Sequence, residues 1–373
     1  MGDSGWAETR GAAPQTCPAN SALTLESTTV TQLFLSSDLF PLHLAIVFLF
    51  GAMMGSFFNV CIYRLPQGRS VNRPRRSFCP SCGMTIAWYD NIPILSYVLL
   101  GGLCRHCGGR ISHRYWLVEL LTALLFSAVF WVHGYTLATT MFLVLTAILI
   151  ISTFTDLDHW IIPDSISLGG AVVGVVGAVA ISAIGAMGRG ADFGRSLYVA
   201  IPFDRMGAWG IAANSLVGAA FGYLLLWTVG VVGTFVFRKE AMGMGDMKLF
   251  ACIGAFFGWQ GCLLVLALAS FLGATIGLSL IAAQWIVAKL WPARSSIALQ
   301  KVEPMGNESA VPETSAAACA GNQPSRRPRG RQLHHLPFGP YIALAGYVVA
   351  LFYRPMTYWL LSHVFFVDLF GGK

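Results

Sequence analysis

The sequence predicts an all-α polytopic membrane protein with about eight transmembrane helices and a small cytoplasmic zinc-binding loop module. Of the 373 residues, 55% are hydrophobic and only 11% are charged, whereas a soluble domain carries about 25% charged residues. Apolar runs near or above ~18 residues, long enough to cross a bilayer, recur along the chain. Four of the nine cysteines form two Cys-x-x-Cys pairs inside one polar segment.

Hydropathy and charge divide the chain into segments. No cleavable signal peptide is expected, because the first apolar run is too long and wrongly flanked for one. Residues 247–291 are nearly all apolar and too long for one span, so we expect a break at Gly258-Trp-Gln-Gly261. The last apolar piece, 356–370, either spans the membrane or lies in its interface. The predicted segments are a polar tail (1–41), the first transmembrane helix (42–63), a cytoplasmic four-cysteine module (64–115), a transmembrane core (116–293), a disordered basic insertion (294–335) and C-terminal transmembrane segments (336–373).

Loop charge predicts the topology. Residues 64–115 contain eight arginines and one acid, Asp90, and an excess of arginine marks cytoplasmic loops. With the N-terminal tail outside, eight spans place the cysteine pairs and the aspartate-containing loops on the same cytoplasmic face. The basic cluster in 294–335 is interpreted as a positive-inside marker, and no nucleic-acid binding is expected.

The cysteine pairs predict a metal site. Cys79-Pro-Ser-Cys82 and Cys104-Arg-His-Cys107 are separated by 21 residues, and each pair is followed by glycine. Four thiolates at this spacing are typical of a closed, structural, tetrahedral zinc site. The alternative is a pair of redox disulfides, which a reducing cytoplasm disfavours.

Two carboxylates at apolar span ends predict aspartyl proteolysis. Asp246 lies in Met242-Gly-Met-Gly-Asp-Met-Lys-Leu249, at the head of an apolar run where an acid is costly. Paired carboxylates that share a proton supply a general acid and a general base together. The residues alone leave three partners open: Asp156, Asp158 and Asp164. Gly243 and Gly245 would let an extended substrate backbone approach.

Three further polar residues have open roles in the sequence. Asn59 is either a packing residue or part of a site. Glu119, one turn into a span, either pairs with Arg114 or another basic residue, or serves a substrate or cofactor. Lys248 either anchors to headgroups or reduces the cost of charge near Asp246.

The motifs, in this order, resemble the type IV prepilin peptidases. They lie within about 42–290 and 336–350. They are Gly55-Ser-Phe-Phe-Asn59 with Tyr63-Arg-Leu-Pro66, the two cysteine pairs, Arg114-Tyr-Trp-Leu-Val-Glu119, Asp156-Leu-Asp-His-Trp-Ile-Ile-Pro163, Gly243-Met-Gly-Asp-Met-Lys-Leu249 and Leu336-Pro-Phe-Gly-Pro340.

The resemblance implies that Asp156 and Asp246 are the catalytic pair. It further implies cleavage of a basic leader after glycine in prepilins and pseudopilins, at the cytoplasmic face of the bacterial inner membrane. The new N-terminus, usually phenylalanine, would then be methylated with S-adenosylmethionine as donor. No Gly-x-Gly-x-x-Gly loop marks where that donor binds. Gly55–Asn59, the cysteine loop and Glu119 are its plausible surroundings.

The sequence leaves other functions open. The chain could be a peptidase that lacks methyltransferase activity. A transporter would place charges at mid-span and carry internal repeats, and neither is visible. A zinc-dependent membrane scaffold without catalysis would tolerate loss of either aspartate.

Overall fold

The computed structural model describes residues 39–74, 76–79, 81–186, 209–239, 242–290 and 338–363. Residues 1–38 of the predicted N-terminal tail and the basic insertion at 294–335 lie outside them. Within these ranges the fold is all-α, and the only β-type contacts are two isolated bridges. The helices are α2 (Phe40–Arg64), η1 (Leu65–Gln67), η2 (Trp88–Asn91), α3 (Leu95–Leu99), α4 (Arg114–His133), α5 (Leu137–His159), α6 (Asp164–Ala186), α8 (Gly210–Phe237), α9 (Met244–Leu290) and α10 (Gly339–His363).

Six of the described helices are long and apolar enough to cross a membrane, judged by length and composition. They comprise α2, α4, α5, α6, α8 and α9, and the apolar part of α10, Gly339–Tyr353, is shorter. Many of their large apolar side chains are exposed, as expected for helices that contact lipid. The chain therefore has the helices of a multi-pass membrane protein.

The predicted count of eight spans is not confirmed, and α9 explains part of the difference. Its apolar stretch of 43 residues would be roughly 65 Å long as one straight helix, about twice the hydrocarbon thickness. The backbone leaves helical geometry at Gly258, with φ 72° and ψ −175°, inside the predicted Gly258–Gly261 break. A second irregularity, at Phe352 in α10, lies shortly before the last predicted apolar piece at 356–370.

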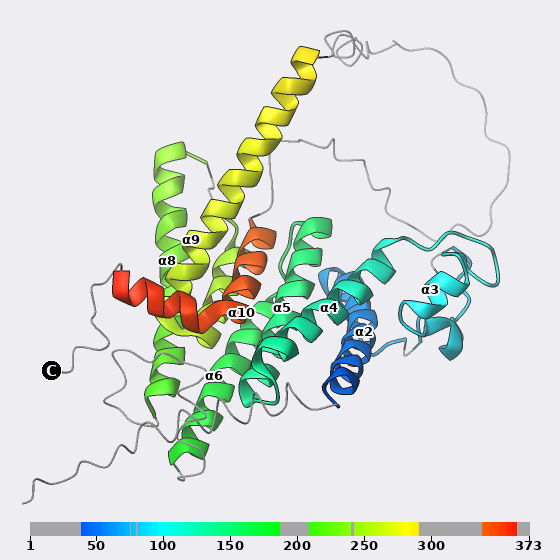
Figure 1. Cartoon of the computed structure of the whole chain (residues 1–373). Coiled ribbons are helices and arrows are strands. Elements are labelled where there is room, and N and C mark those ends of the chain that lie inside the picture. Colours follow the sequence, from blue (N-terminus) through cyan, green and yellow to red (C-terminus); the bar gives the residue numbers. More distant parts are fainter. Residues whose placement is uncertain are drawn as a thin grey trace, which may run out of the picture. The chain divides into compact units, whose positions relative to one another are not determined.

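The chain divides into two compact units. The described part of the first comprises 39–60, 76–79 and 81–143, and that of the second comprises 61–74 together with the described residues from 144 onward. Figure 1 labels the helices of both units. The division runs through α5, so Asp156 belongs to the second unit while the cysteine pairs belong to the first.

In the first unit, small residues let α2 and α4 approach closely. A Cβ added at Gly51 would lie 2.8 Å from Ala123 Cα, and one added at Gly55 would lie 2.7 Å from Glu119 Cα. Real Cβ atoms do not approach that closely, so both positions require glycine. Close backbone packing at small residues is the usual contact between membrane helices, and here it brings Glu119 against α2.

In the second unit, the first part of α9 forms the core, packed against α6, α8 and α10. The α9 side chains of Leu249, Phe250, Ile253, Phe256 and Phe257 are almost completely buried. Polar side chains satisfy carbonyls next to the break. Ser215 Oγ donates to Ala255 O at 2.6 Å, and Tyr353 Oη donates to Phe257 O at 2.7 Å. This core holds the start of α9, and therefore Asp246, in place.

Candidate active site and metal centre

Asp156 lies in the last turn of α5, and only 7% of it is exposed. Asp158 and Asp164 are both exposed. Helix α5 ends at His159, and Trp160 follows with φ 57°, donating its N–H to Asp156 O at 2.9 Å. Of the three carboxylates that the sequence left open, the fold therefore buries only Asp156.

Asp246 lies in the first turn of α9 and is half-buried. An acid there is favoured by the positive end of the helix dipole. Asp246 and Asp156 belong to the same unit, and the charge of Asp156 acts on the Asp246 carboxyl. The structure therefore brings together the two carboxylates that the resemblance pairs. Their catalytic roles remain predictions.

The two glycines before Asp246 have different surroundings. A Cβ at Gly243 would meet nothing closer than Asp246 Oδ2, at 4.0 Å, and Gly243 is exposed. A Cβ at Gly245 would lie 3.1 Å from the Cβ of Ile162. Gly243 therefore leaves open space beside the carboxylate, whereas Gly245 allows α9 to begin close to the loop that follows α5.

The first residue of α10 contacts Asp156. The backbone N–H of Gly339 donates to the Asp156 carboxylate, and a Cβ added at Gly339 would overlap Asp156 Oδ2. The same oxygen is buried without a hydrogen-bond partner in the described structure. Gly339 occurs in one of the motifs that carry the resemblance, but no sequence signal indicated its contact with Asp156.

Lys248 forms an ion pair that neither of its expected roles included. Its Nζ lies 2.7 Å from Asp164 Oδ1 and donates a hydrogen bond to it. The pair links the first turn of α6 to the first turns of α9. Asp164 is therefore a partner of Lys248, and the two helix starts that flank the carboxylates are tied together.

Two similar loops carry the cysteines. In the first loop, the Cys79 N–H donates to Met84 O and Cys79 O accepts from the Gly83 N–H, both at 2.9 Å. In the second loop, the Cys104 N–H donates to Gly109 O and Cys104 O accepts from the Gly108 N–H, again at 2.9 Å. Gly83 and Gly108 have φ of 70° and 65°, which glycine adopts without strain. These glycines let each loop turn its pair of sulfurs inward.

The four sulfurs of Cys79, Cys82, Cys104 and Cys107 lie within 4.8 Å of one another. Cys79 Sγ and Cys107 Sγ are 3.9 Å apart. A tetrahedral zinc with Zn–S bonds of about 2.3 Å would separate its sulfurs by about 3.8 Å. These cysteines are free thiols, and their separations fit a metal ion held by four sulfurs.

Backbone donors favour the thiolate at one end of this cluster. The N–H of Cys82, assisted by that of Ser81, lowers the pKa of the Cys79 thiol to about 6. The Gly109 N–H acts in the same direction on Cys107, but burial and the neighbouring cysteines raise the pKa of its thiol to about 11. Four adjacent thiols cannot all ionise together without a cation between them.

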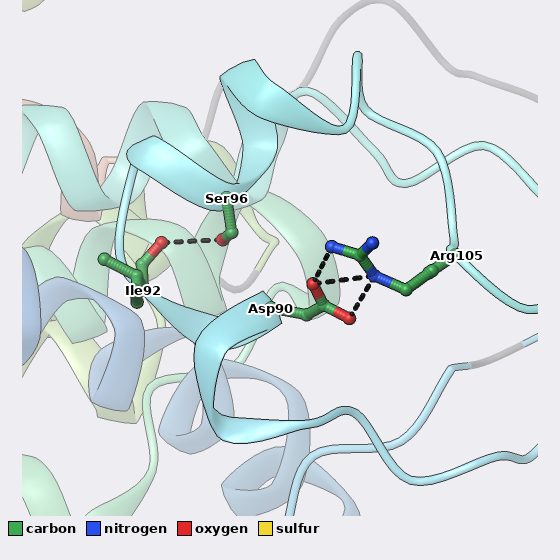
Figure 2. Close-up of polar contacts among 4 residues, drawn as sticks. All are labelled: Asp90, Ile92, Ser96 and Arg105. Atoms are coloured by element: carbon green, nitrogen blue, oxygen red, sulfur yellow. Dashed lines mark hydrogen bonds and ion pairs between the residues drawn. The ribbon is translucent and has the colours of Figure 1, made fainter.

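Arg105, in the second cysteine loop, forms an ion pair with Asp90. Its guanidinium donates to both oxygens of Asp90, with distances of 2.6 to 3.0 Å, and Figure 2 shows this fork. The Arg105 hydrogen bonds hold the pKa of the Asp90 carboxyl below its usual value. In the same view Ser96 Oγ donates to Ile92 O at 2.6 Å and fixes the start of α3.

Glu119 does not pair with a basic side chain in the described structure. Its Oε2 accepts the backbone N–H of Ile94 at 2.7 Å, and the Ser56 hydroxyl also bonds its carboxylate. Asn59 Nδ2 donates to Tyr115 O at 2.9 Å. Of the two roles that the sequence left open for Glu119, a pairing with Arg114 or another basic residue is therefore not observed among the described residues, and neutral donors bind its carboxylate.

Comparison with known proteins places the chain in a family. The profile of the bacterial peptidase A24 N-terminal domain matches residues 49–133, and that of the type IV leader peptidase family matches residues 143–278. A protein from Aeromonas hydrophila, named prepilin leader peptidase/N-methyltransferase, is 31% identical over 86% of this chain and 95% of its own length. The chain belongs to the type IV leader peptidase family.

Two other relatives of this leader peptidase carry the same printed name. The one from Myxococcus xanthus is 41% identical, and that match covers 65% of this chain and 64% of the relative. The one from Pseudomonas aeruginosa is 31% identical over 83% of this chain and 90% of its own length. No solved structure gives a significant match.

Proposed function

We propose that this leader peptidase cleaves the basic leader from type IV prepilins and pseudopilins, after glycine, and methylates the new N-terminal residue. The single observation that carries the cleavage is the pair Asp156 and Asp246, two carboxylates at helix ends in one compact unit. The relatives' printed names support both the cleavage and the methylation.

In the proposed mechanism, one carboxylate of the pair is ionised and takes a proton from water. The other is protonated and donates to the carbonyl oxygen of the scissile peptide bond while the water oxygen bonds to the carbonyl carbon. The proton taken from water then passes to the amide nitrogen as the carbon–nitrogen bond breaks, and the donated proton returns to the second carboxylate as the carboxyl product forms. The Gly339 N–H holds Asp156 in place, and the open space beside Gly243 admits the substrate backbone. Both carboxylates lie at helix ends, where water and an unwound substrate can reach them.

The cysteine cluster is proposed to hold zinc through Cys79, Cys82, Cys104 and Cys107. Bound zinc would supply four bonds that fix the module, and four sulfurs leave no open position for a catalytic water. Its role is therefore structural, within the module that we associate with methylation (64–115).

Methylation requires S-adenosylmethionine, whose sulfonium supplies an activated methyl group. The amine nitrogen of the new N-terminus must first lose a proton. It then forms the nitrogen–carbon bond, and the electron pair of the methyl–sulfur bond stays on sulfur. The peptidase core is proposed to follow from residue 116, and both activities are placed at the cytoplasmic face of the bacterial inner membrane, in contact with lipid and without nucleic acid.

The test uses the purified chain in proteoliposomes with a full-length prepilin and S-adenosylmethionine. Mass spectrometry of the product should show loss of the leader at glycine and one added methyl group. A cleaved product without the methyl group would favour the alternative, a peptidase that lacks methyltransferase activity. An uncleaved prepilin would contradict the proposal.

A further inference from the structure

The first unit contains two acidic residues in its described part, and their surroundings differ. Asp90 is neutralised by the Arg105 fork. Glu119 is 9% exposed and has no cationic partner among the described residues. An ionisable side chain inside a membrane helix is costly and usually functional. Among the described residues of this unit, Glu119 is therefore the acid whose charge has no counter-charge.

The surroundings of Glu119 are built for a carboxylate. Gly55 allows α2 to pack closely against the Cα of Glu119, and this contact brings the Ser56 hydroxyl to the Glu119 side chain. The Ile94 N–H is the second donor. An ionised carboxylate offers about four acceptor positions, so two donors leave about half of them for another ligand.

The Ile94 donor is held in an uncommon conformation. Ile94 has φ 63° and ψ −52°, and the N–H of Leu95 donates to Pro93 O at 2.6 Å, which closes a three-residue turn. Such a turn is strained at a β-branched residue, and strain of this kind clusters at functional sites. The strained turn aims a donor at Glu119, in the segment between the two cysteine pairs.

Both reactants of the proposed methylation are cationic. The new N-terminus of the pilin arrives as an ammonium ion, and the methyl donor carries a sulfonium and an amino-acid ammonium. Two cations repel each other in a low-dielectric site unless an anion lies between or beside them. We propose that the Glu119 carboxylate binds a cationic reactant of methyl transfer in the first unit. This inference rests on the proposed methyltransferase activity.

The test is Glu119→Gln in the full chain, reconstituted in nanodiscs. Glutamine has nearly the same shape and keeps one oxygen that can accept the Ile94 N–H, while the charge is removed and the second oxygen is replaced by an NH2 donor. One arm measures equilibrium binding of S-adenosylmethionine. The other arm measures binding of a processed pilin peptide with a free amine against the same peptide acetylated at its N-terminus. Loss of a buried charge partner should weaken the affinity for one cationic ligand by about 30-fold. The arm in which the affinity changes identifies the ligand that Glu119 binds.

A matched control is Thr122→Val in the same α2–α4 contact. Thr122 is buried, and its hydroxyl donates to Val118 O within α4, so valine alters the contact without a change of charge. The variant should keep both affinities. The inference is overturned if Glu119→Gln binds both cationic ligands as the wild type does, or if it also loses leader cleavage, which would make Glu119 a structural residue. Absence of methylation in the wild type would instead contradict the proposed function.

Discussion

At the residue scale, the two aspartates near the end of α5 differ in burial although they are close in sequence. Asp156 and Asp158 are two residues apart in one helix, yet the first is buried and the second is exposed. Asp156 is in addition contacted by the first backbone N–H of α10, which comes from far along the chain. Such a contact between distant segments has no local sequence signal, and it yields a prediction for a residue outside the carboxylate pair.

Gly339→Ala should abolish most cleavage, because the added Cβ would overlap Asp156 Oδ2 and displace the carboxylate. A misplacement on the order of 1 Å can cost about 100-fold in rate. We expect kcat to fall by about that factor with KM little changed, measured by initial rates on a prepilin peptide.

The control for Gly339 is Gly346→Ala on the same helix. A Cβ at Gly346 would lie 3.4 Å from Leu149 Cδ1, an ordinary contact. This variant should cleave at nearly the wild-type rate. An equal loss of cleavage rate in both variants would show that Gly339 matters only for the packing of α10, and would contradict its proposed role in positioning Asp156.

At the element scale, α9 and the cysteine loops differ in how far the sequence predicts them. The length of the 247–291 apolar run predicted a break, and glycine at 258 indicated where it lies. Hydropathy does not reveal whether the two parts cross the membrane separately, which is why the span count differs. The cysteine spacing predicted the metal-binding geometry directly. The strained turn at Ile94 was not predictable, because isoleucine has no preference for positive φ.

Gly258→Ala should destabilise the second unit. Gly258 has φ 72°, and an added Cβ would overlap the buried Asn214 side chain. Backbone strain and overpacking together should cost on the order of 2 kcal/mol or more, detected as a lower Tm in detergent. Gly277→Ala, later in α9, has nothing within 4 Å of the added Cβ and should keep the wild-type Tm. A similar Tm for both variants would contradict the packing described at the break.

Cys82→Ser should release zinc from the first unit. Elemental analysis should find a single zinc ion per wild-type chain and much less in the variant, because three thiolates bind more weakly than four. The Ile94 turn lies between the two cysteine pairs, so methylation should fall more than cleavage. Cys61→Ser, outside the cluster, serves as the control and should retain zinc. A Cys82→Ser chain with full zinc content would refute the metal site.

At the scale of the whole molecule, composition and the length of the apolar runs predicted a helical membrane protein, and motif order predicted its family. Both predictions are confirmed. Neither indicated that the chain forms two compact units divided within α5, with the cysteine cluster and Glu119 in one and both aspartates in the other. This division follows from packing between helices distant in sequence. It implies that the two proposed activities can be lost separately.

The most direct test compares Asp156→Asn and Asp246→Asn with Asp158→Asn, each reconstituted with prepilin and S-adenosylmethionine. Intact-mass spectrometry should find the precursor uncleaved with the first two variants and processed with the third. Only the first two substitutions remove a carboxylate from the Asp156–Asp246 pair, and with it the proton that the pair shares. All three should methylate a pre-cleaved pilin, which shows that they are folded. Leader removal by either Asp156→Asn or Asp246→Asn at the wild-type rate would contradict the carboxylate pair as the peptidase centre.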